Sequence, residues 1–122
     1  MKKLIVFTLI LISLLFISQI TYCQPNREEW QPPEEVLNAI GIETGMIIGE
    51  IGAGRGYMTF PLLERVGPEG KVYANDISIR DLNYLKEKAK REGFTNLETI
   101  EGKVDDPVFP VNELNLMIMV YV

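Results

Sequence analysis

Residues 46–56 constrain this chain more than any other stretch, because they join a short apolar run to three closely spaced glycines. Residues 46–51 are mostly apolar and β-branched, which is typical of a strand buried on both faces. The glycines then occupy alternate positions, at Gly52, Gly54 and Gly56. Glycine reaches backbone angles that are closed to other residues and lets the main chain approach a ligand closely. A strand, a glycine turn and a following helix therefore predict a nucleotide-type binding site.

The spacing of these glycines restricts the class of ligand that the turn can bind. A dinucleotide fingerprint has the form G-x-G-x-x-G. Here the third glycine comes one residue early, so that the pattern is E-x-G-x-G-x-G. The chain contains no G-K-S or G-K-T sequence, which excludes a phosphate loop of the ATPase type. The turn is therefore predicted to bind a ligand other than a dinucleotide or a nucleoside triphosphate.

Two acids stand where a ligand on this turn would meet them. Glu50 lies near the end of the first apolar run, and Asp76 follows the next apolar run, residues 72–74. An acid at the position of Asp76 can accept hydrogen bonds from both hydroxyls of a ribose. Glu50 is placed to face a ligand ammonium. A ligand with an amino-acid end and a ribose end therefore fits the two acids better than a dinucleotide does.

Over residues 36–122, the chain resembles the class I methyltransferases that use S-adenosylmethionine. Residues 50–56 are similar to the first motif of that family, and residues 72–76 are similar to its second motif. Residues 56–59 and 66–72 also resemble the isoaspartate methyltransferase branch, and a general methyltransferase domain fits as well. The resemblance implies S-adenosylmethionine as the cofactor and methyl transfer to an unknown acceptor as the function. Three alternatives stay open: a glycine turn without a ligand, a truncated, non-catalytic cofactor-binding fragment, and an NAD-type Rossmann dehydrogenase.

The resemblance also implies which residues hold the cofactor. They come from the two motifs and from the loop after the third predicted strand: Glu50, Gly52, Ala53, Gly54, Gly56, Asp76 and Asp105. Related methyltransferases place an acid directly after a glycine in this loop, where it meets the adenine amino group. In this chain Lys103 follows Gly102, so Asp105 is the substitute candidate. No catalytic residue is assigned, because substrate residues of this family often follow the fourth strand.

Composition excludes several other classes of function. The 122 residues leave room for one domain. The chain has no histidine, which excludes histidine general-base chemistry and histidine metal sites. A single cysteine excludes an intrachain disulfide and a cysteine-rich zinc site, so no metal is expected. The net charge of −5 argues against a nucleic-acid backbone as the main partner, since such a partner needs a basic patch.

Residues 1–23 form a separate segment with the layout of a secretory signal peptide. Lys2 and Lys3 precede an apolar run at residues 4–17, and polar sequence follows the segment. The segment is therefore expected to engage the secretion machinery or the membrane, either as a signal peptide or as an uncleaved anchor. Acylation at Cys23 and a buried core helix are the alternatives. Export conflicts with the cytosolic supply of S-adenosylmethionine, so a cytoplasmic location is also kept as an alternative.

The remaining chain predicts an α/β fold, a Rossmann-like parallel sheet with flanking helices. Residues 24–33 are expected to be a linker and residues 34–122 the N-terminal part of a methyltransferase domain. The expected helices are residues 34–40, a segment from about 57–59 to 66, and 78–92, and the expected strands are 46–51, 71–75, 97–101 and 114–122. In the family fold, the strand order is 3-2-1-4, with the ligand at the carboxyl ends of the strands.

The last predicted strand, residues 114–122, is nearly all apolar and is expected to be buried. In the complete family fold, a fifth strand and its helices cover the outer edge of this strand. Here the outer edge and the apolar faces of residues 117–122 are expected to lie uncovered. An exposed apolar edge is a template for association with another chain. We therefore expect residues 24–122 alone to self-associate through the fourth strand or to fold poorly.

Overall fold

The computed structural model describes Met1 and residues 26–120. The predicted signal peptide or anchor at residues 1–23 lies outside the described residues, apart from Met1, and its role stays a prediction. Contacts divide the chain into two units, Met1–Trp30 and Gln31–Val122. In the first unit, the helix α2 (Arg27–Trp30) lies inside the segment that was predicted to be a linker. Across the described residues, no helix combines the length and the apolar character needed to cross a bilayer.

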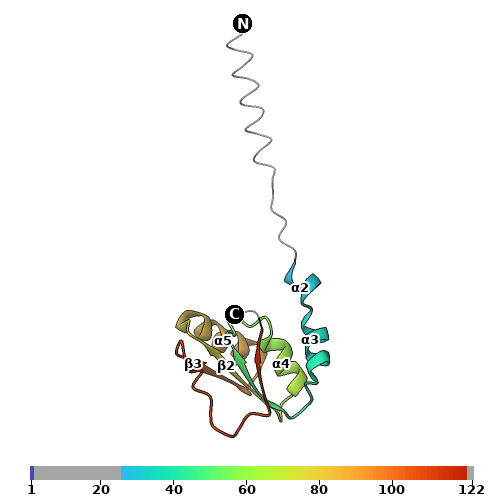
Figure 1. Ribbon diagram of the computed structural model, residues 1–122, viewed down its shortest axis with the longest axis vertical. Coiled ribbons are helices and arrows are strands. Elements are labelled where there is room, and N and C mark those ends of the chain that lie inside the picture. Colours follow the sequence, from blue (N-terminus) through green and yellow to red (C-terminus); the bar gives the residue numbers. More distant parts are fainter. Residues whose placement is uncertain (2–25, 121–122) are drawn as a thin grey trace. The chain divides into compact units, whose positions relative to one another are not determined.

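The second unit is built on one sheet of four parallel strands (Figure 1). The strands are β1 (Ile47–Ile51), β2 (Lys71–Asp76), β3 (Leu97–Glu101) and β4 (Leu116–Met119). Their order in space is β3-β2-β1-β4, as predicted. The order reverses between β1 and β4, and such a reversal opens a crevice at the carboxyl ends of the strands. The fold therefore confirms the predicted Rossmann-like sheet and places its ligand edge at the end of β1.

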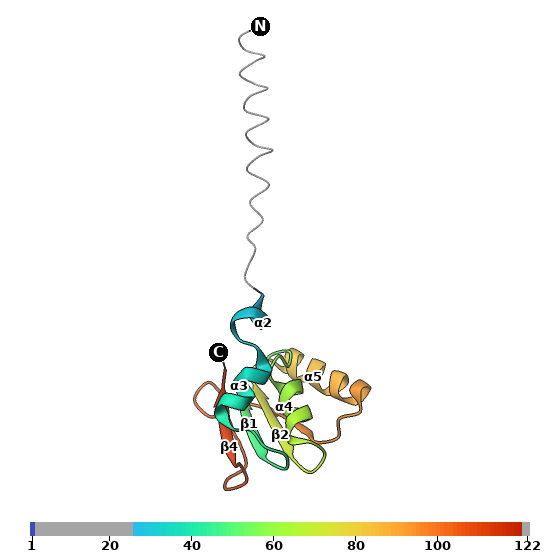
Figure 2. The ribbon, with the colours of Figure 1, turned by 90° about the vertical axis from the view of Figure 1, so that its right-hand side faces the viewer.

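The helices on one side of this sheet are α3 (Pro33–Ile40), α4 (Thr59–Val66) and α5 (Ile79–Glu92) (Figure 2). Several of their bounds follow from local signals: Gly41 and Gly93 terminate α3 and α5 with left-handed backbone angles, and the Ser78 hydroxyl accepts the Asp81 N–H at the start of α5. Their apolar faces and the helix-facing side chains of the strands form the core, whose fully buried members are Leu37, Ile48, Met58, Leu62, Leu63, Leu85, Val66 and Val72.

On the opposite face of the sheet, the loop between β3 and β4, residues 102–115, covers β1 and β2 and leaves Met117 and Met119 of β4 exposed. Polar bonds hold this loop in place. The Asn75 side-chain amide donates to the Pro107 carbonyl at 2.7 Å, and the Tyr73 hydroxyl donates to the Glu113 carboxylate at 2.6 Å. Asn75 and Tyr73 are 4% exposed each, so both bonds start from buried positions on β2. The two faces of the sheet are therefore covered differently, one by apolar helix packing and the other by a hydrogen-bonded loop.

The strand β4 is shorter and more exposed than the sequence suggested. It spans Leu116–Met119, whereas the prediction was residues 114–122, of which 121 and 122 lie outside the described part. Ile118 is 7% exposed, but Met117 is 53% exposed and Met119 65% exposed. Successive side chains of a strand point to opposite faces, so only the face of β4 that carries Ile118 is covered. The exposure of Met117 and Met119 agrees with the expectation of uncovered apolar side chains on this strand, whereas the expectation of a fully buried strand does not hold for them. Self-association through β4 stays a prediction.

A cluster of four side chains joins β2, β3 and the loop before β4. The Lys71 ammonium donates to the Glu98 carboxylate at 2.7 Å and to the Tyr73 hydroxyl at 3.0 Å. The bond to the Glu113 carboxylate raises the pKa of Tyr73 above its usual value of 10.0. The bond to Glu98, followed by the bond to Tyr73, raises the pKa of Lys71 as well. Both groups therefore stabilise the fold while they are protonated, and this contribution disappears as the pH rises through their folded-state pKa values.

We predict that the Tyr73→Phe variant is less stable than the wild type by about 1 kcal/mol at neutral pH, because it lacks the hydrogen bond to Glu113. The stabilisation by Tyr73 is fully present below the unfolded-state pKa of 10.0 and is lost at higher pH. The difference between the two proteins should therefore shrink above pH 10. Urea denaturation at neutral and at alkaline pH measures both effects, and a difference that does not change with pH would contradict this role of the hydroxyl.

Candidate functional site

The glycine turn lies at the carboxyl end of β1, just before α4. Gly52, Gly54 and Gly56 have φ angles of 69°, 54° and 91°, in the left-handed region that other residues adopt only with strain. The Ala53 N–H donates to the Asn75 carbonyl at 2.9 Å, which joins the turn to the end of β2. The glycine spacing read from the sequence therefore corresponds to a turn with positive φ at each of its glycines.

Gly54 and Gly56 are glycines for different reasons. A Cβ atom at Gly56 would lie 2.5 Å from Phe60 Cε2 and 2.6 Å from Leu85 Cδ2, so a side chain there would clash with α4 and α5. A Cβ atom at Gly54 would meet nothing within 4 Å. Packing therefore requires glycine at position 56, whereas position 54 leaves open space beside the backbone. That space is where a ligand can approach the main chain.

The Asp76 carboxylate joins the glycine turn to the start of α5. Its Oδ2 atom accepts the Gly54 N–H at 2.8 Å, and its Oδ1 atom accepts the Ser78 N–H at 2.8 Å. The Asp76 carbonyl also accepts the Gly102 N–H at 3.1 Å, which fixes the first residue after β3. A carboxylate has about four acceptor positions on its two oxygens, so Asp76 retains capacity for a ligand hydroxyl. The second predicted motif therefore lies against the first one at the carboxyl edge of the sheet.

The Glu50 side chain is held by a hydrogen bond on the side of β1 that faces the helices. It is 3% exposed, and its Oε2 atom accepts the hydroxyl of Thr59 at 2.6 Å. Thr59 is the first residue of α4 and is fully buried. A buried carboxylate requires such partners, because loss of hydration disfavours its charge. Sequence reasoning gave Thr59 no role, although its place in the first turn of α4 was the available signal, and contact of Glu50 with a ligand ammonium stays a prediction.

A pocket of about 230 Å³ lies beside Asp76. Its lining comes from the ends of β1 and β2 and from the loop after β3: Ile51, Gly52, Asn75, Asp76, Ile77, Lys103 and Val104. Ile77 is 67% exposed and Val104 is 97% exposed, so two apolar side chains stand at the pocket in contact with solvent. Neither residue was singled out from the sequence. Together with the Asp76 carboxylate, these side chains suit a ligand in which a ring with hydroxyl groups is joined to a flat, less polar ring.

The structure does not bring Asp105 into this pocket. Its side chain is exposed, and the lining from the same loop consists of Lys103 and Val104. Its contact with a cofactor therefore stays a prediction that the arrangement of the loop does not favour. Among the described residues, no group of histidine, cysteine, aspartate and glutamate side chains has the arrangement of a metal site.

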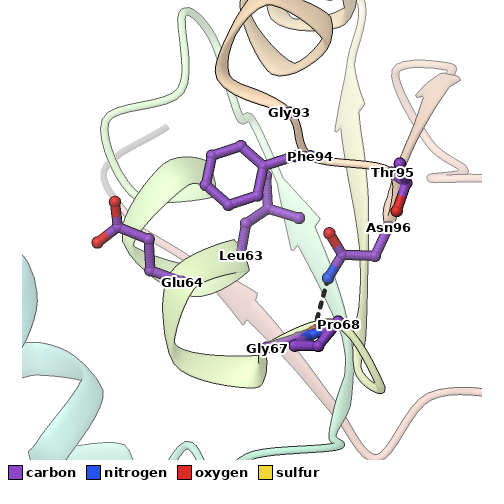
Figure 3. A pocket seen from close by; sticks show the side chains of 8 residues that line it. All are labelled: Leu63, Glu64, Gly67, Pro68, Gly93, Phe94, Thr95 and Asn96. Carbon is purple, nitrogen blue, oxygen red and sulfur yellow. Dashed lines mark hydrogen bonds between the residues drawn. The ribbon is translucent and has the colours of Figure 1, made fainter.

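A second pocket, of about 220 Å³, lies at the amino ends of the strands (Figure 3). It is lined by residues from the ends of α4 and α5 and from the turns after them: Leu63, Glu64, Gly67, Pro68, Gly93, Phe94, Thr95 and Asn96. The Asn96 side-chain amide donates to the Gly67 carbonyl at 2.8 Å, which ties the two turns together. This pocket contains no residue of either motif, and ligands of such sheets bind at the carboxyl ends. The pocket beside Asp76 is therefore the candidate ligand site.

Comparison with known sequences identifies a family. Residues 48–122 match the family model described as a methyltransferase domain. The chain is 32% identical over 82 residues to the demethylmenaquinone methyltransferase of Geobacillus stearothermophilus, a match that covers 67% of this chain and 35% of that protein. It is 31% identical over 78 residues to an aklanonic acid methyltransferase of Streptomyces sp. strain C5, covering 64% of this chain and 36% of that protein. The chain thus spans about a third of the length of these relatives.

Solved structures agree with the sequence comparison. A SAM-dependent methyltransferase from Aquifex aeolicus has a TM-score of 0.71 and 33% identity, covering 79% of this chain and 51% of that chain. A dimethyladenosine transferase from Plasmodium falciparum has a TM-score of 0.63 and 30% identity, covering 74% of this chain and 31% of that chain. Both matches contain the fold described above, which confirms the predicted resemblance at the level of architecture.

We predict that two glycine substitutions in the turn differ in their effect on stability. Gly54→Ala introduces only the strain of a left-handed alanine, which costs about 1–2 kcal/mol, because its Cβ atom enters open space. Gly56→Ala adds a clash with Phe60 and Leu85, and overpacking costs about 1–3 kcal/mol more. Chemical denaturation of the two variants measures the difference. Equal stabilities would show that the turn is not packed against α4 and α5 as described.

Proposed function

Since the chain belongs to the methyltransferase domain family, we propose that it binds S-adenosylmethionine and supports methyl transfer to an acceptor molecule. One observation carries this proposal: the Asp76 carboxylate is hydrogen-bonded to the Gly54 N–H at the edge of an open pocket. This arrangement supports the proposal, because Asp76, the acid proposed for the ribose hydroxyls, lies directly beside a glycine turn that leaves room for a ligand. The SAM-dependent methyltransferase of Aquifex aeolicus, with its TM-score of 0.71, supports the proposal.

The residues of the site fit the three parts of this cofactor. Asp76 would hold the ribose hydroxyls, because a carboxylate at the end of the second strand accepts both of them. The open backbone at Gly54 would lie along the amino-acid part, with Glu50 beneath the turn. The pocket between Ile77 and Val104 would take the base, since burial of these exposed side chains against a ring is favourable.

The residues of this chain would contribute to the proposed reaction by positioning the cofactor. The cofactor, when bound, supplies an activated methyl group on a positively charged sulfur. The glycine turn and Asp76 would fix where that group lies, and placement of a methyl group in line with a nucleophile accounts for a large part of such a rate enhancement. The acceptor remains unassigned, and so does any residue that takes a proton from it.

We predict that the purified chain binds S-adenosylhomocysteine and does not bind NAD. The early third glycine of the turn departs from the dinucleotide fingerprint, while Glu50 and Asp76 suit a ligand with an ammonium and a ribose. Isothermal titration calorimetry with each ligand at equal concentration measures the preference. Tighter binding of NAD than of S-adenosylhomocysteine would overturn the proposed cofactor.

We predict that Asp76→Ala weakens binding of S-adenosylhomocysteine by about 1.5–3 kcal/mol, the range for hydrogen bonds to a charged group, or roughly 10- to 150-fold in affinity. Asp76→Asn should lose less, because an amide oxygen can still accept one of the backbone N–H groups that Asp76 holds. Glu101→Ala is the matched control, since Glu101 pairs with Asp76 in the sheet register but is absent from the pocket lining. If Asp76→Ala kept both its fold, checked by circular dichroism, and its affinity, Asp76 would be removed from the site.

A further inference from the structure

We propose that Lys103 sets the base specificity of the pocket beside Asp76, so that the pocket accepts a 6-oxopurine nucleoside as readily as an adenine nucleoside. Lys103 lines this pocket together with Ile77 and Val104, and it contributes a positive charge to the lining. The inference deepens the proposed function and rests on it, since it concerns the base of the ligand whose ribose Asp76 holds.

The order of the strands indicates where the base lies. The glycine turn follows β1, Asp76 ends β2, and Lys103 belongs to the loop that follows β3. Because β2 lies between β1 and β3, a ribose at Asp76 has the glycine turn on one side and the loop on the other. The amino-acid part of the ligand belongs at the glycine turn, which has open space at Gly54. The base, which is attached directly to the ribose, is therefore directed toward Lys103.

The loop that carries Lys103 is held by hydrogen bonds at both ends of its first turn. The Gly102 N–H donates to the Asp76 carbonyl at 3.1 Å, and the Lys103 N–H donates to the Asp106 carbonyl at 2.7 Å. The Asn75 amide then fixes Pro107 at 2.7 Å. These bonds place the backbone of Lys103 beside the end of β2. Its position at the pocket therefore depends on the sheet itself.

The hydrogen-bonding groups of the Lys103 ammonium determine which bases it can recognise. A lysine ammonium has three donors and no acceptor. Adenine presents an amino donor next to its ring-nitrogen acceptors, whereas a 6-oxopurine presents O6 and N7 as adjacent acceptors, the pair that lysine binds on guanine. A carboxylate at this place would accept from the adenine amino group and select for it. Lys103 cannot do so, and this chain therefore lacks the side chain that would reject a ligand without the amino group.

The test compares two ligands that differ only at C6 and N1 of the base, S-adenosylhomocysteine and S-inosylhomocysteine, in which O6 and an N1–H replace the amino group and the N1 acceptor. Calorimetry on the full chain gives the ratio of their dissociation constants. For the wild type, we expect S-inosylhomocysteine to bind at least as tightly as S-adenosylhomocysteine. For Lys103→Asp, we expect a preference for S-adenosylhomocysteine of about tenfold or more, the discrimination that one well-placed pair of base contacts provides. Lys103→Gln, which has both a donor and an acceptor, should lie between them.

Glu101→Ala is the matched control, because Glu101 ends β3 just before this loop and is not part of the pocket lining, and it should keep the wild-type ratio. The inference fails if the wild type binds S-adenosylhomocysteine and rejects S-inosylhomocysteine. It also fails if Lys103→Asp, with an unchanged circular dichroism spectrum, keeps the wild-type ratio. In both cases the proposed function stands. If the wild type binds neither ligand, the proposed function fails and this inference fails with it.

Discussion

The hydrogen bond from the Gly54 N–H to the Asp76 carboxylate, at 2.8 Å, is the contact on which the ligand edge of this sheet depends. It joins the two motifs, which belong to neighbouring strands and are far apart in the sequence. The same residue accepts the Ser78 N–H, which begins α5, and the Gly102 N–H, which begins the loop after β3. One aspartate therefore fixes the turn after β1, the helix after β2 and the loop after β3 relative to one another.

The two faces of the sheet impose different limits on the site. On the helix face, the core side chains are apolar and buried, and the buried Glu50 carboxylate accepts the Thr59 hydroxyl. On the loop face, Asn75 and Tyr73 hold the covering segment by hydrogen bonds to Pro107 and Glu113. Segments with few buried apolar contacts open more readily than a packed core does. The part of the pocket that this loop forms is therefore the part whose conformation a bound ligand changes most easily. The glycine turn is held more firmly, because Gly56 packs against Phe60 and Leu85.

Local signals were sufficient to predict most of the fold. The glycine spacing, the helix ends at Gly41 and Gly93 and the cap at Ser78 each act within a few residues, so the sequence defined them correctly. The exposure of Met119 on β4 was expected from the resemblance to the family fold and not from the residue itself, because an apolar side chain does not reveal whether another element will cover it. The loop was also beyond local reasoning. Whether Lys103 or Asp105 lines the pocket depends on long-range bonds, such as the one between Asn75 and Pro107, that no spacing in the sequence encodes.

The arrangement of charge across the site follows the same strand order and limits the ligand further. The acids Glu50 and Asp76 stand at the ends of β1 and β2, whereas Lys103 stands on the β3 side. Opposite charges attract more strongly where protein replaces water, so the buried carboxylate of Glu50 acts more strongly on a ligand charge than the exposed Lys103 does. A positive centre is therefore favoured at the glycine turn, near Glu50. A ligand with its positive charge at the turn and an uncharged ring at the loop uses this carboxylate, whereas the reversed orientation would leave the positive charge away from it.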